Sequence, residues 1–91
     1  MVKFQRITTK DTALYNYMER LMTASFPSEE YRPLEELRNY TDTKTHFYCN
    51  IILHHDTPVG FITYWDFGHF YYVEHFAIDP SLRNGGHGKN V

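Results

Sequence analysis

This sequence lacks the features that mark secreted and membrane-spanning proteins. Cys49 is its only cysteine, so no disulfide can form within the chain, and this suits the reducing cytoplasm. No stretch approaches the roughly 20 consecutive apolar residues that a membrane span needs. The first residues also contain no apolar signal core. We therefore expect a cytoplasmic protein with no membrane partner.

The sequence also lacks clusters of basic residues and the residue spacings typical of metal sites. Nine Lys and Arg residues stand against 11 Asp and Glu residues, the net charge is −2, and no basic cluster occurs, which argues against a nucleic-acid partner. The six histidines and Cys49 show neither HExxH nor paired Cys and His spacing, so we expect no metal site. No basic neighbour marks Cys49 as a nucleophile, and a small core residue is expected there.

The chain does carry the apolar patterning of a single domain that spans residues 1–91. Apolar residues make up 42% of the sequence and aromatic residues 18%, with no repeat or low-complexity tract. The periodicity predicts the following elements in order: a strand at 2–8, helices at 11–25 and 33–40, strands at 46–53, 59–67 and 70–78, and a loop at 79–88. This order predicts an α/β fold of layered α+β type, in which the helices pack on an antiparallel sheet.

The last predicted strand, at 70–78, is nearly all apolar, so we expect both of its faces to be buried. A glycine-rich segment, RNGGHGK at 83–89, follows it closely. Successive backbone N–H groups that open a helix bind anions, and glycines let the backbone approach a phosphate. The segment is not a P-loop, because Arg83 stands where that motif needs a glycine. These residues indicate a candidate diphosphate-binding loop with Arg83 and Lys89 adding charge at its edges.

The stretch YVEHFAIDPSLRNGGHG, at 72–88, resembles the fourth strand and acetyl-CoA loop of the GNAT superfamily of N-acetyltransferases. Arg83, Gly86 and Gly88 match the family signature Q/R-x-x-G-x-G/A, whereas Asn84 departs from the second glycine that many members have. The stretch SFPSEEYRP also resembles the segment between the first two helices of the family. The resemblance implies that this chain is the N-terminal half of a GNAT fold.

The resemblance further implies an acetyl-CoA-dependent N-acetyltransferase that uses no metal and acts on a small-molecule or peptide amine. In the family, the backbone of the fourth strand pairs with the pantetheine arm, a role that would fall on Phe76 and Ile78. The loop would bind the pyrophosphate through Arg83, Asn84, Gly85, Gly86, His87, Gly88 and Lys89.

Glu74 is the candidate catalytic base or amine-binding carboxylate. It is one of two polar residues in an apolar strand, and it lies two residues before Phe76. The alternative is a strand-end carboxylate that reaches water or a local lysine. His75 is a weaker candidate because we expect it on the opposite face, where a histidine hydrogen-bonded at the sheet surface is the default. Glu29 and Glu30 fit a solvated helix start, although in the family this region borders the acceptor site.

A second function stays open, namely a truncated or degenerate copy that acts only as a self-associating interaction module. The family fold continues beyond the glycine loop with further helices and strands that are absent from this sequence. We expect the 91-residue chain alone to bind acetyl-CoA poorly and to be inactive. We also expect a homodimer through the last strand, because an unpaired strand edge attracts another chain.

Overall fold

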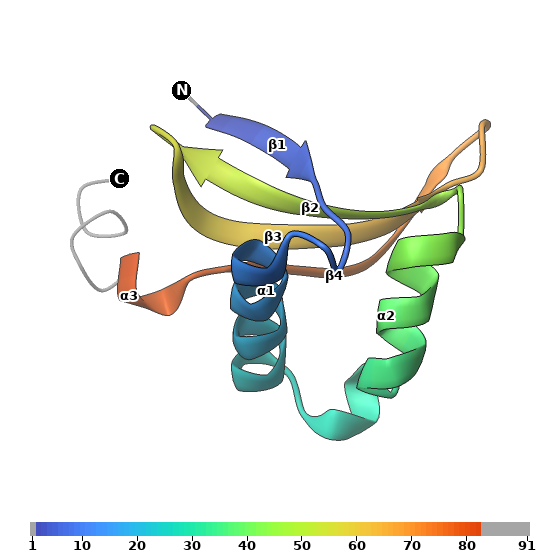
Figure 1. Ribbon diagram of the computed structural model, residues 1–91, viewed down its shortest axis with the longest axis horizontal. Coiled ribbons are helices and arrows are strands. Elements are labelled where there is room, and N and C mark those ends of the chain that lie inside the picture. The colour runs from blue at the N-terminus through green and yellow to red at the C-terminus, as the bar shows by residue number, and fades with distance from the viewer. Residues whose placement is uncertain (1, 83–91) are drawn as a thin grey trace.

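The computed structural model describes residues 2–82 and shows a sheet with two helices packed on one face (Figure 1). The strands are β1 (Val2–Arg6), β2 (Phe47–His54), β3 (Thr57–Asp66) and β4 (Tyr71–Ile78). The helices are α1 (Thr12–Ser25) and α2 (Leu34–Thr43), with a 3-10 turn η1 (Ser28–Glu30) between them and a short helical segment α3 (Pro80–Leu82) after β4. The predicted layered α+β fold class is confirmed. No helix within the described range is both long and apolar enough to cross a membrane.

The sheet is fully antiparallel in the order β1-β2-β3-β4. A two-residue turn joins β2 to β3, and both of its residues have positive φ, 51° at His55 and 65° at Asp56. Such primed turns match the twist of the strands that they connect. The tight turn lets β3 begin at Thr57, two residues before the predicted start at position 59.

The core lies between the sheet and the two helices. Its largest fully buried side chains are those of Phe47, Phe61, Ile7, Met18, Met22 and Ile51. Cys49 is 1% exposed within this cluster, which confirms its expected place in the core. Burial raises the pKa of its thiol to about 12, so the thiolate that a nucleophile needs does not form at neutral pH.

Two further element boundaries differ from the sequence prediction by more than one residue, both for local reasons. β1 ends at Arg6 because the backbone N–H of Thr8 turns to donate to the Asp11 carboxylate, 2.9 Å away. α2 continues to Thr43 instead of stopping at position 40. The hydroxyls of Thr41 and Thr43 each donate to the carbonyl oxygen four residues earlier, at 2.8 and 2.7 Å, and so remain satisfied within the helix.

β4 forms one edge of the described sheet, and much of its apolar surface is exposed. Tyr71 is 68% exposed, Tyr72 57% and Phe76 53%. The expectation that both faces of this strand are buried is therefore wrong for residues 2–82. The reason is that, within the described residues, α1 and α2 lie on the same face of the sheet and neither covers the other face (Figure 1).

Candidate functional site

A β-bulge in β4 decides which side chains reach the helix side of the sheet. Thr63 of β3 pairs with His75, and the next residue, Tyr64, pairs with Val73, so Glu74 has no partner in the ladder. Neighbouring side chains on a regular strand point to opposite faces, whereas an extra residue re-aims them. Glu74 and His75 both contact the segment between α1 and α2. The expectation that His75 lies on the face opposite Glu74 is therefore wrong.

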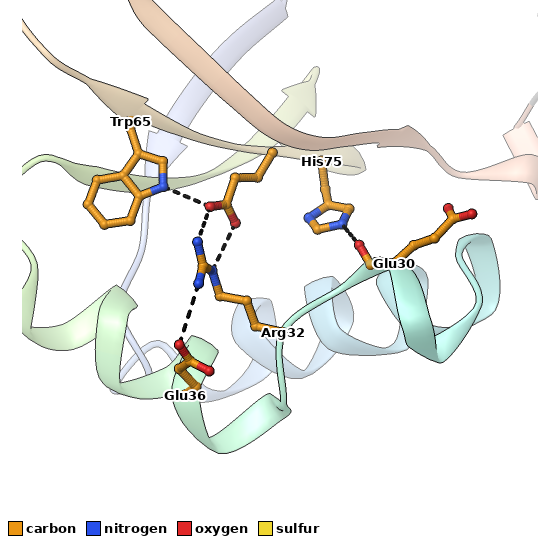
Figure 2. A network of polar contacts seen from close by, with 6 residues as sticks. Glu30, Arg32, Glu36, Trp65 and His75 are labelled. Atoms are coloured by element: carbon orange, nitrogen blue, oxygen red, sulfur yellow. Dashed lines mark hydrogen bonds and ion pairs between the residues drawn. The ribbon is translucent and has the colours of Figure 1, made fainter.

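The Glu74 carboxylate is bound by two donors from different elements. Arg32, in the loop before α2, donates from Nε to Oε1 at 3.1 Å and from its terminal NH2 group to Oε2. Trp65 of β3 donates from Nε1 to Oε2 at 2.8 Å. In Figure 2, dashed lines from Arg32 and Trp65 meet at one unlabelled carboxylate, which these hydrogen bonds identify as that of Glu74. The Glu74 side chain is only 9% exposed, so the ion pair lies almost entirely out of water on the Glu74 side.

The Arg32 guanidinium makes two further contacts, both with α2. Its other terminal nitrogen lies 3.4 Å from Oε1 of Glu36, and its central carbon lies 4.6 Å from the centroid of the Tyr40 ring. The Arg32 side chain is 30% exposed and that of Glu36 is 40% exposed. Arg32 therefore joins β4 to α2 and faces two carboxylates at once (Figure 2).

These contacts decide the charge of Glu74. Burial alone would raise the pKa of its carboxyl, but the hydrogen bonds from Arg32 and Trp65 outweigh burial and lower the pKa below its ordinary value. Glu74 is consequently ionised at neutral pH, and Arg32 neutralises it. A carboxylate of low pKa accepts protons poorly, so this geometry suits charge recognition better than general base catalysis.

The His75 ring lies beside this network. Its Nε2 atom is 2.7 Å from the carbonyl oxygen of Glu30, and because a carbonyl only accepts, Nε2 carries the proton (Figure 2). The ring of Phe26 packs edge-on against it at a centroid distance of 4.9 Å. Nδ1 is buried and has no hydrogen-bond partner among the described residues. In the neutral ring, Nδ1 therefore holds a free lone pair.

A pocket of about 260 Å³ lies between η1 and β4. It is lined by Glu29, Glu30, Tyr31, Arg32, Tyr72, Glu74 and His75. Three carboxylates and one guanidinium give this lining an excess of negative charge, which favours a cationic ligand. Glu29 and Glu30 thus line the same pocket as Glu74 and His75 of β4, whereas Phe76 and Ile78 do not line it.

The outer edge of β4 presents backbone groups at the positions that the sequence singles out. The N–H of Asp79 donates to the carbonyl oxygen of Val59 at 2.8 Å, so the backbone of Asp79 faces β3. Successive residues of an antiparallel strand alternate in this respect. Ile78 and Phe76 therefore direct their N–H and C=O groups away from β3, toward an edge that has no partner strand within residues 2–82. The remaining candidates, Arg83, Asn84, Gly85, Gly86, His87, Gly88 and Lys89, lie outside the described residues.

Arg32 and Trp65 were not singled out by the sequence. The Arg32 contact joins positions 42 residues apart, and no local pattern encodes such a pairing. The sequence did contain one usable signal, because Arg32 lies within the stretch SFPSEEYRP that resembles the acceptor-side segment of a known family.

The profile of the acetyltransferase (GNAT) family matches residues 12–91. A solved structure described as a GNAT-family acetyltransferase from Bacteroides thetaiotaomicron is 61% identical, with a TM-score of 0.89. The alignment covers 97% of this chain and 50% of the Bacteroides protein, so the chain spans about half the length of that relative.

Two structures of an aminoglycoside acetyltransferase from an uncultured soil metagenomic sample, one with sisomicin and one with trehalose, share the fold at 22% and 21% identity. Their TM-scores are 0.62 and 0.61, and the alignments cover 98% of this chain and 63% of theirs. No curated protein matches the chain.

Proposed function

This chain belongs to the acetyltransferase (GNAT) family, and from that membership we propose that it is part of an acetyl-CoA-dependent N-acetyltransferase that acts on an amine. The observation that carries the proposal is the position of the η1–β4 pocket. It opens on the helix side of the same strand whose outer backbone edge is unpaired in residues 2–82. A cofactor lying along that edge would meet an acceptor in the pocket at the bulge.

The acetyl-CoA side of the proposal rests on β4 and the segment that follows it. The outward N–H and C=O groups of Phe76 and Ile78 fit an amide-containing arm that adds to the sheet as a further strand. The glycine-rich segment at 83–89 would then bind the pyrophosphate through backbone N–H groups. When bound, acetyl-CoA supplies the acetyl group as a thioester that the amine nitrogen attacks.

The acceptor side of the proposal rests on the charges in the pocket. An amine of pKa about 10 arrives as an ammonium ion and must lose a proton before it attacks. Glu74 is ionised at neutral pH and nearly buried, so it suits binding and orienting the ammonium group. His75 Nδ1 has no hydrogen-bond partner among the described residues, which supports a role as proton acceptor, while Nε2 donates to the carbonyl oxygen of Glu30.

Acetyl transfer is best tested on a completed chain, which we define as residues 1–91 followed by the second half of the Bacteroides protein. Release of free CoA thiol in the presence of a panel of primary amines measures turnover. Glu74→Gln should lower kcat for the amine with little change in the KM for acetyl-CoA, because the substitution touches only the acceptor pocket. A kcat within twofold of the parent would make Glu74 structural.

A second function, a self-associating module, is favoured by one specific observation. Phe70, Tyr71, Tyr72 and Phe76 are each more than half exposed around an edge strand. An exposed apolar edge strand can pair with the same strand of a second copy, which would give a homodimer across β4. The two functions differ in one measurable respect, because the dimer would occupy the same strand edge that acetyl-CoA needs. A completed chain that binds acetyl-CoA as a monomer excludes the module.

A further inference from the structure

We propose that Arg32 occupies the cation subsite of the η1–β4 pocket and exchanges places with the ammonium group of the acceptor, moving from Glu74 to Glu36. The inference deepens the proposed function, since it rests on the acceptor being an amine. It makes Arg32 the residue that selects for cationic acceptors. It also means that Arg32 must leave Glu74 before this carboxylate can bind the amine.

The first support is that Arg32 and Trp65 engage both oxygens of Glu74. Arg32 binds them through two nitrogens, and Trp65 shares Oε2. A third donor would have to enter a carboxylate that is only 9% exposed. The three bonds leave one of the roughly four acceptor positions of the carboxylate, so an ammonium group gains full contact with Glu74 only by displacing one of the two donors. Arg32 is the displaceable donor, because it is partly exposed and comes from a loop, whereas Trp65 is fixed within β3.

The second support is that a second carboxylate, that of Glu36, already lies within reach of Arg32. Glu36, in the first turn of α2, lies 3.4 Å from the terminal nitrogen that does not contact Glu74, and the guanidinium carbon lies over the Tyr40 ring at 4.6 Å. Rotation toward α2 would give up Glu74, keep and tighten the existing contact with Glu36, and keep the stacking on the ring. The exchange thus leaves neither the guanidinium nor Glu74 without an opposite charge.

This exchange implies a definite selectivity. A neutral ligand of the same shape carries no positive charge to replace that of Arg32, so the ion pair between Arg32 and Glu74 stays intact. A primary ammonium brings both charge and donors, and Glu29 and Glu30 in the pocket lining add attraction for it. The acceptor class is therefore a primary amine that is protonated when it enters the pocket.

Trp65 provides a reporter for the test, because it is the only tryptophan of the 91-residue chain and it donates to Glu74. Its fluorescence is followed while n-butylammonium chloride is added at pH 8 and constant ionic strength, with n-butanol and sodium chloride as matched titrants. We expect a saturable change with the amine alone. Arg32→Met should tighten amine binding at least tenfold, because the internal competitor is gone.

Two further variants keep the test decisive. Glu36→Gln removes the destination of Arg32 while leaving the Arg32–Glu74 contact in place, so amine binding should weaken. Arg38→Met is the matched control, because it removes another two-point Arg–Glu contact, with Glu19 at 2.9 and 3.0 Å, that lies outside the pocket lining. Amine binding should not change in this control. If Arg32→Met does not fold, Glu36→Gln decides the question.

The exchange is overturned if the parent chain shows no saturable change with n-butylammonium, if Arg32→Met binds the amine no tighter than the parent, or if Glu36→Gln binds it no weaker. None of these outcomes bears on acetyl-CoA binding, which tests the proposed acetyltransferase function separately. Calorimetry with acetyl-CoA alone involves no acceptor, so intact acetyl-CoA binding beside a failed exchange would refute only the role of Arg32.

Discussion

The contact between Arg32 and Glu74 makes a quantitative prediction for Glu74→Gln in the 91-residue chain. Hydrogen bonds to a charged group contribute about 1.5–3 kcal/mol each, and Glu74 accepts three of them. The glutamine carbonyl can still accept one, and the partly exposed Arg32 keeps Glu36 and can replace a second bond with water. The net loss is then about one hydrogen bond to a charged group, or about 2 kcal/mol. For a domain of this size that corresponds to a fall in Tm of roughly 8–16 °C.

The same contact predicts how the loss depends on pH. The pKa of Glu74 is lower in the folded chain than its ordinary value of 4.5, so as the pH falls the unfolded chain takes up the proton first. The stabilisation is therefore complete above pH 4.5 and is lost as the pH falls through the folded pKa. Thermal unfolding followed by circular dichroism should show a large difference between parent and Glu74→Gln at pH 7.

That difference should shrink steadily on acidification below pH 4.5. Glu19→Gln, which weakens the more exposed pair with Arg38, is the matched control and should cost less. A difference in Tm under about 2 °C at pH 7, which is well below 1 kcal/mol, would refute the reasoning. So would a difference that grows as the pH falls.

Three further outcomes are expected. In thermal unfolding, Gly60→Ala should lower stability by about 2–3 kcal/mol, because the new Cβ would lie 2.4 Å from the backbone oxygen of Ala77 in β4. Gly68→Ala should cost only about 1 kcal/mol, because its φ of 87° is strained for alanine but no atom lies within 4 Å of the new Cβ. Cys49 should resist iodoacetamide at pH 8 in the folded chain and react once urea unfolds it; rapid labelling of folded protein would contradict its burial. Sedimentation equilibrium at micromolar concentration should give a mass above 10.9 kDa, whereas a clean monomer mass would refute association through β4.

The sequence predicted the order and type of the elements because their signals are local. Apolar spacing marked both helices, and runs of aromatic and β-branched residues marked the strands, so each element lies within a few residues of its expected range. The boundary errors came from contacts that a periodicity cannot encode, such as the turn of Thr8 toward Asp11. The exposure of β4 depends on which face the helices cover, and the apolar composition of the strand does not encode this.

The candidate site was predicted only in part, for a related reason. Glu74 stood out as a polar residue in an apolar strand, but its environment is set by the bulge and by a loop 42 residues earlier. One unpaired residue in the ladder brought His75 to the same side, and strict alternation cannot anticipate it. The roles of Glu74, His75, Phe76 and Ile78 remain predictions, as does that of the glycine-rich segment.

Calorimetric titration of acetyl-CoA into the completed chain and its Gly86→Glu variant tests the central claim most directly. The variant places a side chain and a negative charge in the segment that should bind the pyrophosphate, while residues 2–82 stay unchanged. We predict one acetyl-CoA bound per chain for the parent and no measurable binding for the variant. Equal affinity in the two proteins, or no binding by the parent, would contradict the assignment of β4 and the glycine-rich segment as an acetyl-CoA site.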